Sequence, residues 1–271
     1  MIKRDKAYSQ RYGEVLTLAS SLWNGTLETL LAHRSIRVYE DKTLEAGTLE
    51  LLIAAAQSAA SSSNLQAWSV VAVEDAERKK RLAQYVGGQK HVAQCPIFLV
   101  WLADLARLQA VADSVATTAE ALPFTEMFVL AVIDAALAAQ NAVIAAESLG
   151  LGSVYIGGIR NQPLQVAEEL KLPPQVFPVF GLCLGYPKGE AQVKPRLPQS
   201  AVLHRETYDN QAWQPAVHHY DRIMAKFYQD HHMKVQGTWS QHSSDRIKGS
   251  ESLSGRHLLR DKLTTLGFPL H

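Results

Sequence analysis

Five short segments of this chain carry side chains and glycines of the kinds that bind a phosphate and a planar ring. They are His33-Arg34-Ser35-Ile36-Arg37, Ser61 to Gln66, Gly87-Gly88-Gln89, Tyr155 to Gly158 and Lys194-Pro195-Arg196. Imidazole, guanidinium, ammonium and hydroxyl groups are common donors to phosphate oxygens, and adjacent glycines let a ligand approach the backbone. Together the segments predict a binding site for a charged, planar cofactor.

Two of these segments are basic. The first places His33, Arg34, Ser35 and Arg37 directly after a predicted helix, where a solvated basic helix end would carry the same residues. In Lys194-Pro195-Arg196 the proline fixes the backbone between two cations, a pattern that ordinary surface loops also show. Neither segment establishes an anion site by itself.

The remaining segments are polar or rich in glycine. Residues Ser61 to Gln66 follow a predicted hydrophobic helix and precede a predicted strand, where they could line a ribityl chain or cap the helix. Tyr155-Ile156-Gly157-Gly158 ends a strand, and its glycines suit either a close ligand or a tight turn. No G-x-G-x-x-G sequence opens a helix after a strand, so this is not the dinucleotide-binding fingerprint.

Other kinds of catalytic site are disfavoured. The pairs His218-His219 and His231-His232 have no Cys or His partner at ligand spacing, so we expect no metal site. No G-x-S-x-G is present, and Cys95 and Cys183 lie in apolar runs where buried free thiols are the ordinary outcome. We therefore expect no side-chain nucleophile.

Composition sets the size and class of the protein. The 271 residues are 47% hydrophobic, enough for one large core, and 27 Lys and Arg balance 26 Asp and Glu. A net charge of +1 gives no field that would hold the protein on nucleic acid or an anionic membrane. The longest apolar run, Met127 to Leu149, is interrupted by polar residues such as Asp134 and is a poor membrane span. We expect a soluble, cytoplasmic protein.

The expected elements place the segments at the ends of helices and strands. Helices are predicted over 26–32, 43–60, 76–85, 124–149, 165–172, 217–228 and 258–266, and strands over 68–74, 97–103, 152–156 and 179–184. In 124–149, Asp134, Asn141 and Ser148 recur every seven residues on an alanine-rich background, which predicts a buried central helix packed in its own core or at a subunit contact. Residues 1–25, which end at the turn signal Asn24-Gly25, are interpreted as an extension outside the core fold.

Taken in order, these segments resemble the nitroreductase family of flavoproteins, in the branch of oxygen-insensitive NAD(P)H nitroreductases and NAD(P)H:FMN oxidoreductases. The resemblance extends from about Leu27 to Tyr208 and continues weakly through Thr238-Trp239-Ser240. The matching motifs are His-Arg-Ser-Ile-Arg at 33–37, the segment Ser61 to Gln66 (the serine row), Gly-Gly-Gln-Lys-His-Val at 87–92, Ala-Ala-Gln-Asn at 138–141 with Ala-Ala-Glu-Ser at 145–148, Tyr155 to Arg160, and Lys-Pro-Arg-Leu-Pro at 194–198.

The resemblance implies an α+β fold with a mixed, mainly antiparallel sheet flanked by helices, assembled as an intertwined homodimer with tightly bound FMN at each of two interface sites. It divides the chain into the N-terminal extension 1–25, an FMN-binding core 26–208 and a C-terminal excursion 209–271 that wraps the partner subunit.

The resemblance also implies roles for individual residues. Those that would surround the FMN phosphate are His33, Arg34, Ser35, Lys194 and Arg196. Others would contact the rest of the cofactor, and these are Ser61, Ser62, Ser63, Asn64, Gln66, Tyr155 and Ile156. Arg37 and Gln89 would face the pyrimidine edge of the ring, and the amides of Gly157 and Gly158 would donate toward its N5 and O4 edge.

The implied reaction is a ping-pong hydride transfer from NADPH or NADH through N5 of FMN to a nitroaromatic compound, a quinone or free flavin. Arg37, Gly157 and Gly158 are the catalytic residues that the resemblance implies. A fixed guanidinium at Arg37 stabilises the negative charge that reduction leaves on the N1 and C2-carbonyl edge, and the two glycine amides tune the ring where hydride arrives.

The nucleotide donor stays open. Relatives that prefer NADPH carry a basic pair with an arginine before Thr238, whereas this chain has Lys234-Val235-Gln236-Gly237, so Lys234 is the candidate contact to the nicotinamide nucleotide. Two alternative functions also stay open: a flavin-binding carrier or sensor without turnover, and a flavin-dependent dehalogenase on the same fold.

Overall fold

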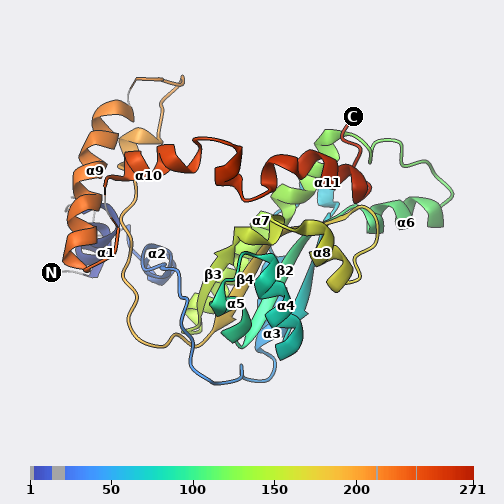
Figure 1. The fold of residues 1–271 in the computed structure, drawn as a ribbon, viewed down its shortest axis with the longest axis horizontal. Coiled ribbons are helices and arrows are strands. Elements are labelled where there is room, and N and C mark those ends of the chain that lie inside the picture. Colours follow the sequence, from blue (N-terminus) through green and yellow to red (C-terminus); the bar gives the residue numbers. More distant parts are fainter. Residues whose placement is uncertain (1–2, 14–21, 212, 236) are drawn as a thin grey trace. The chain divides into compact units, whose positions relative to one another are not determined.

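The computed structural model in Figure 1 describes residues 3–13, 22–211, 213–235 and 237–271. Residues 1–2 and 14–21 of the predicted extension 1–25 lie outside these described residues. So does Gln236, in the segment Lys234 to Gly237 that contains the candidate nucleotide contact. The chain divides into two compact units, of which the first comprises residues 1–34 with 191–253 and the second comprises residues 35–190 with 254–271. Each unit therefore joins segments that are far apart in the sequence.

The second unit is built on a four-stranded sheet. Its strands are β1 (Trp68–Val73), β2 (Ile97–Asp104), β3 (Gly152–Ile156) and β4 (Val176–Gly185). Their order is β1-β2-β4-β3 and each neighbouring pair is antiparallel, while a parallel bridge joins Ser35 to Ser153. All eight residues of β2 are buried, which explains why its sequence is apolar on both faces. The sheet confirms the predicted α+β fold and the four predicted strands.

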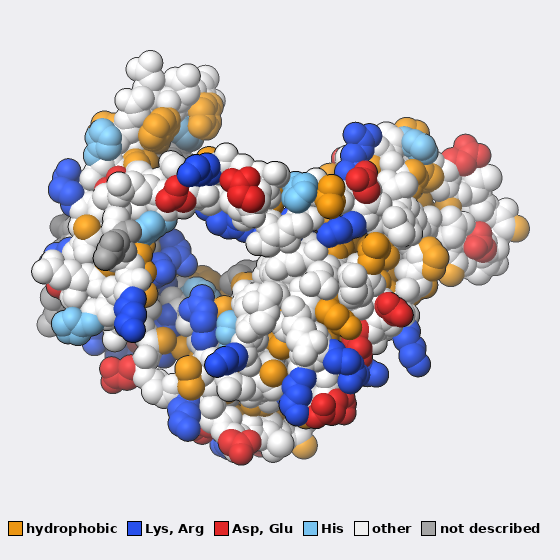
Figure 2. Space-filling model, in the orientation of Figure 1, with side chains coloured by type: hydrophobic (Ala, Val, Ile, Leu, Met, Phe, Trp, Pro, Cys, Tyr) orange, Lys and Arg blue, Asp and Glu red, His pale blue; other side chains and the backbone are white. Residues whose placement is uncertain are grey.

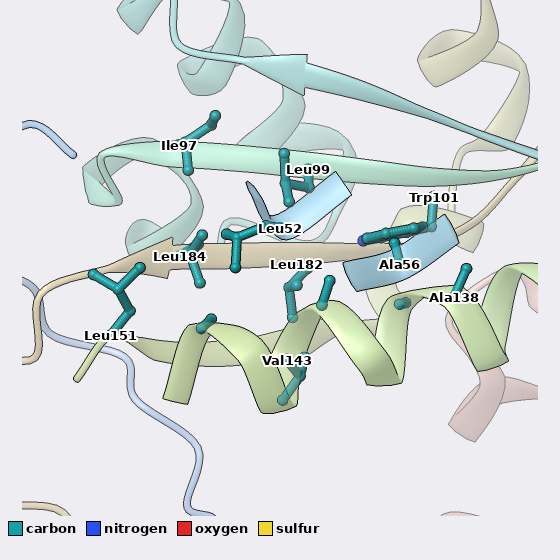
Figure 3. Close-up of a cluster of buried hydrophobic side chains, with 13 residues drawn as sticks. Leu52, Ala56, Ile97, Leu99, Trp101, Ala138, Val143, Leu151, Leu182 and Leu184 are labelled. Carbon is teal, nitrogen blue, oxygen red and sulfur yellow. The ribbon is translucent and has the colours of Figure 1, made fainter. Parts of the chain in front are cut away.

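Helices pack on this sheet and on one another. They are α3 (Thr48–Gln57), α4 (Ala76–Tyr85), α5 (Lys90–Gln94), α6 (Ala106–Ser114), α7 (Thr125–Ser148) and α8 (Pro163–Glu169). Figure 3 shows the core cluster that includes Leu52 of α3, Val143 of α7, Trp101 of β2 and Leu182 of β4. The small side chains of Ala138, Ala139, Ala142 and Ala146 on α7 are fully buried in this cluster and let α3 pack closely. The prediction of a central, buried helix is confirmed.

The C-terminal segment of the chain packs into the same unit. Helix α11 (Leu259–Thr265) and the residues after it contribute Leu263 and Phe268 to a second core cluster. Phe128 meets Phe268 edge to face at a centroid distance of 5.2 Å, and the backbone N–H of Thr125 donates to the carbonyl of His271 at 3.2 Å. Residues 254–271 therefore contribute to the core of the second unit. The wrapping of a partner by residues 209–271 stays a prediction.

The first unit is helical. Its helices are α1 (Lys3–Tyr12), α2 (Gly25–Leu31), α9 (Trp213–Asp230) and α10 (Trp239–Arg246). Helix α9 buries Tyr220, Met224 and Tyr228 against Leu197 and Trp239. Helix α10 begins at a capping box in which Thr238 and Gln241 satisfy each other's backbone N–H groups.

Helix ends depart from the sequence predictions where a cap was misplaced. Helix α2 begins at Gly25, one residue before the predicted start at residue 26, because the side chain of Asn24 caps it by accepting from the N–H of Leu27 at 3.0 Å. Helix α3 begins at Thr48 rather than Thr43, since Gly47 at the N-cap adopts a φ of 83°. Helix α8 begins earlier than predicted, with Pro163 in its first turn.

The described surface carries both charge signs, and one described helix is strongly apolar. Basic and acidic side chains both occur across the face shown in Figure 2, as expected for a nearly neutral chain. Helix α7 alone among the described helices is long and apolar enough to cross a membrane. Its contacts with α3, β1, β2 and β3 instead place it in the core of the second unit.

An ion cluster joins α4 to α8. The Glu169 carboxylate accepts from Arg81 Nε at 2.8 Å and from Arg78 Nε at 3.1 Å. These hydrogen bonds lower the pKa of Glu169 to about 2 from an ordinary value of 4.5, and the bond to Arg81 has the largest effect. Because the pKa is depressed in the folded state, the carboxylate stabilises the fold fully above pH 4.5 and loses that contribution as the pH falls toward 2.

We therefore predict that Glu169→Gln lowers the melting temperature at pH 7 by roughly 2 °C, a small shift because the arginines are about half exposed. The difference from the wild type should shrink between pH 4.5 and pH 2, as measured by thermal unfolding at several pH values. The exposed neighbour Glu168 provides the control variant Glu168→Gln. A difference that stays constant down to pH 2 would contradict the assignment.

Candidate functional site

The serine row is anchored by a buried carboxylate of α7. Asp134 is 1% exposed, and its Oδ2 accepts from Ser61 Oγ at 2.7 Å and from the N–H of Ala67 at 3.1 Å. Its Oδ1 accepts from the N–H of Ser62 at 3.2 Å. Ser61 Oγ in turn accepts from the N–H of Gln66 at 2.7 Å. One buried acid therefore holds both ends of the row, which explains the polar position in an apolar helix.

The backbone of the serine row is strained between these anchors. Ser63, Asn64 and Gln66 have φ values of 50°, 56° and 50°, in the left-handed region that residues other than glycine seldom adopt. The Arg107 guanidinium supports this conformation by donating to the carbonyl of Gln66 at 2.6 Å. As a result, the side chains of Ser62, Ser63, Asn64 and Gln66 remain exposed.

The glycines at the end of β3 lie against the loop that carries Gln89. Gly158 belongs to a 3-10 turn, η2 (Gly157–Arg160), and a Cβ on it would come within 2.6 Å of the Val86 carbonyl oxygen and 2.8 Å of Gln89 Nε2. The Gln89 side-chain amide donates to that same Val86 carbonyl at 2.9 Å. The structure therefore brings the predicted residues Gln89, Gly157 and Gly158 together.

Arg37 lies near the start of α5. The side chain of Arg37 is exposed. The pKa of His91, the second residue of α5, is lowered mainly by the burial of its imidazole and further by the positive charge of Arg37. Tyr39, two residues on, donates its buried hydroxyl to the carbonyl of Ile36 at 2.7 Å, and burial raises the pKa of that phenol. Gln89 immediately precedes α5 as its N-cap, two residues before His91.

Tyr155 and Ile156 contribute in different ways. Tyr155 packs edge to face on Phe180 at a centroid distance of 5.2 Å, and its hydroxyl lies 3.4 Å from Gln140 Oε1 on α7. Ile156 is 1% exposed, so only its backbone is available to a ligand. Ser35 is exposed beside β3, where the N–H of Ile36 donates to the Ser153 carbonyl at 2.8 Å.

The predicted phosphate-binding cations belong to the first unit. His33, Arg34, Lys194 and Arg196 all lie in it, and Arg34, Lys194 and Arg196 are exposed. A pocket of about 600 Å³ has Lys194 and Arg196 in its wall, together with Tyr12, Tyr220, Tyr228 and Trp239. The Tyr220 hydroxyl donates to the carbonyl of Pro195 at 2.8 Å and so fixes the loop between the two cations.

Lys234 and the histidine pairs lie in the same unit. Lys234 is exposed after the end of α9. In the part of the chain that the structure describes, no three His, Cys, Asp or Glu side chains gather in a group that could hold a metal ion. Cys95 and Cys183 are both buried free thiols.

Three residues of the site were not predicted. Asp134 was visible as a polar interruption of an apolar helix, but its partners lie up to 73 positions away in the sequence. His91 was part of a motif, yet the sequence showed nothing of its proximity to Arg37. Arg11 lies in the presumed extension and donates to the carbonyls of both His33 and Lys194.

Each unit carries donor groups of the kinds that a phosphorylated flavin accepts. Cations and a fixed proline loop are gathered in the first unit, and hydroxyls, amides and a guanidinium are gathered at the ends of β3 and α5 and in the serine row of the second unit. A Cβ at position 158 would clash with the Val86 carbonyl and with Gln89 Nε2, so a glycine is needed where η2 packs on the loop that carries Gln89.

Comparison with known proteins assigns the family. Residues 30–186 match the nitroreductase family, and residues 194–271 match the C-terminal domain of the nitroreductase family. The chain is 41% identical to the FMN reductase (NADPH) of Bacillus subtilis strain 168, over 90% of this chain and 98% of that protein. It is 44% identical to the oxygen-insensitive NADPH nitroreductase of Salmonella typhimurium strain LT2, over 80% of this chain and 88% of that protein.

The fold agrees with this assignment. The solved structure of B. megaterium NfrA2 superposes with a TM-score of 0.87 at 38% identity and covers 92% of this chain and 100% of that one. Sequence and fold agree over both parts of the chain, which therefore belongs to the nitroreductase family.

Proposed function

We propose that this protein is an FMN-dependent NAD(P)H oxidoreductase that passes hydride to nitroaromatics, quinones or free flavins. The observation that carries the proposal is the 41% identity across nearly the whole length of an FMN reductase (NADPH). A relative described as an oxygen-insensitive NADPH nitroreductase supports the same donor and extends the acceptors to nitro compounds.

The first-unit cations are proposed to hold the phosphate of FMN. Arg34, Lys194 and Arg196 supply charge-assisted donors, His33 adds an imidazole N–H, and Ser35 adds a hydroxyl at the start of the second unit. Because Pro195 is buried and its carbonyl accepts from Tyr220, Lys194 and Arg196 extend from a fixed backbone. A fixed backbone lowers the entropy lost when an anion binds.

The second-unit residues are proposed to contact the rest of the cofactor. Bound FMN supplies the two-electron hydride chemistry, which no side chain of the chain supplies by itself. Arg37 places a permanent positive charge where reduction builds up negative charge, and it thereby favours hydride acceptance. Gln89 keeps its side-chain oxygen available while its amide group is held by the Val86 carbonyl, which fixes its orientation. The amides of Gly157 and Gly158 are proposed to donate toward the N5 and O4 edge, and the backbone of Ile156 and the side chain of Tyr155 border them.

A surface of α7 supports the proposed homodimer. Val129, Ile133 and Leu137 are 43%, 51% and 44% exposed, and their i, i+4, i+8 spacing places them on one side of the helix. An apolar stripe of this kind on a central helix is suited to a second copy of the chain. A cytoplasmic location is proposed with it, because NAD(P)H is the electron donor.

The first test is spectroscopic. We expect the purified protein, as isolated or reconstituted with FMN, to show flavin absorbance that bleaches with one equivalent of NADPH or NADH under anaerobic conditions. Steady-state oxidation of the same nucleotide should then require an added nitro compound, quinone or free flavin. A flavin that binds but is not reduced would favour the carrier or sensor, and a protein that cannot bind FMN would contradict the proposal.

The second test concerns Arg37. Arg37→Ala should slow flavin reduction by about 10- to 100-fold while the Kd for FMN changes little, because the lost charge stabilises the reduced ring more than the oxidised one. Stopped-flow reduction and a flavin titration measure the two effects. Lys80→Ala removes an exposed cation that pairs with Glu77 on its own helix, and it should leave both unchanged. Equal losses in binding and reduction at Arg37 would show a binding role only.

The third test concerns the α7 stripe. Ile133→Glu should shift the protein from twice the chain mass to the monomer mass in light scattering after gel filtration, because it places a charge in an apolar contact. Val111→Glu on α6 is the matched control, since Val111 is 54% exposed in the same unit but lies outside the stripe. A wild-type monomer would contradict the proposed homodimer, and an Ile133→Glu variant that stays dimeric would place the contact elsewhere.

A further inference from the structure

Helix α1 precedes the region matched to the nitroreductase family and contacts the predicted phosphate-binding segments. The family match begins at residue 30, and α1 ends at Tyr12. Its last turn carries Arg11, which is 6% exposed although it is charged. A buried guanidinium needs acceptors, and the position of those acceptors shows what the helix does.

Arg11 donates to three backbone carbonyls among the described residues. Arg11 Nη2 donates to the carbonyl of His33 at 2.7 Å and to that of Leu31 at 2.8 Å, and Nη1 donates to the carbonyl of Lys194 at 3.1 Å. In the opposite direction, the N–H of Arg196 donates to the carbonyl of Arg11 at 2.8 Å. Arg11 thus joins His33 to Lys194 and Arg196 through its side chain and its backbone, although Lys194 lies more than 160 positions after His33 in the sequence.

The guanidinium suits this task for two reasons. Its planar fork holds several donors in a rigid arrangement, so the carbonyls of His33 and Lys194 are kept at a fixed separation. Leu31 is the last residue of α2, and a cation at a helix C-terminus is favoured by the exposed carbonyls there. The same contact therefore stabilises α2 and the backbone of the segment that follows it.

Other contacts keep α1 in place. Tyr8 stacks on Tyr12 at a centroid distance of 5.8 Å, and Tyr12 borders the pocket of Lys194 and Arg196. Gly13 has a φ of 74° and passes so close to α9 that a Cβ would come within 2.6 Å of Ile223 Cγ2. The helix is therefore fixed at its C-terminal end, next to the cations.

We propose that Arg11 is a positioning residue for the phosphate of the flavin cofactor. It does not touch the ligand in this proposal, and it sets the separation of the backbone segments from which His33, Lys194 and Arg196 extend. The inference rests on the proposed function, since it assigns those three side chains to the phosphate. Without Arg11 the two segments would each keep their cations but lose their common support, and the ordering of the phosphate site would have to occur on binding.

The phosphate specificity of this role provides the test. FMN and riboflavin share the ring and the ribityl chain and differ in the phosphate. We expect Arg11→Ala to raise the Kd for FMN by about 10- to 100-fold and to leave the Kd for riboflavin nearly unchanged, both measured by fluorescence titration of the flavin-free protein. A general loss of structure would weaken both flavins together.

A second arginine of the same helix gives a matched control. Arg4 is 9% exposed, but its Nε donates to Asp5 on α1 at 2.9 Å, and it makes no hydrogen bond to the phosphate-binding segments among the described residues. Arg4→Ala should therefore keep the wild-type ratio of FMN to riboflavin affinity. If Arg11→Ala does not fold, Arg11→Lys takes its place, because a lysine keeps the charge but cannot span the carbonyls as a fork does.

The outcomes separate this inference from the proposed function. A wild-type protein that prefers FMN to riboflavin, with the preference retained in Arg11→Ala and Arg11→Lys, would overturn the positioning role alone. A fall in the ratio of the same size in Arg4→Ala would overturn it as well, since it would show a general effect of α1. A wild-type protein that binds neither flavin would overturn both the inference and the proposed function.

Discussion

The site in the second unit depends on the burial of one carboxylate. Asp134 can stay in an apolar helix only if its oxygens are hydrogen-bonded, and its donors come from Ser61, Ser62 and Ala67 at the two ends of the serine row. The row is therefore tied to α7, and its left-handed residues are held in a conformation that the free peptide would leave. Since α7 packs on α3 and β2, the hydrophobic core determines where the exposed hydroxyls and amides lie.

The first unit fixes its backbone with a buried group of the opposite charge. The buried Arg11 donates to carbonyl oxygens, whereas the buried Asp134 accepts hydrogen bonds from N–H and O–H groups. In both units the buried charge holds the backbone, and the side chains next to it stay exposed for a ligand. This division separates the residues that position from the residues that bind, so binding does not have to break the contacts that maintain the loops.

Much of the fold could be predicted because its signals are local. The strands over 97–103 and 152–156 and the helix over 76–85 follow from apolar runs and periodicity, and the structure confirms them. Helix α1 was missed because its buried residues are the two arginines Arg4 and Arg11, and hydrophobic periodicity does not register buried charges. The candidate residues came from motif order, but their supports did not, because the partners of Asp134 and Arg11 are distant in the sequence. Gly158 shows the same limit. A side chain at this position would collide with the Val86 carbonyl, and no local sequence pattern reveals that contact.

Helix α7 would also connect the site to the proposed dimer contact. The residue that anchors the serine row, Asp134, directly follows Ile133, which lies in the exposed apolar stripe. A helix packed only within one chain would gain nothing from Val129, Ile133 and Leu137 at its surface, because exposed apolar area lowers solubility without adding to the core. Covering this stripe with a second copy would restrain the same helix that holds the serine row. Dimer formation and the geometry of the cofactor site would then be coupled through one rigid element, because a displacement of α7 cannot occur without moving the carboxylate on which the row depends.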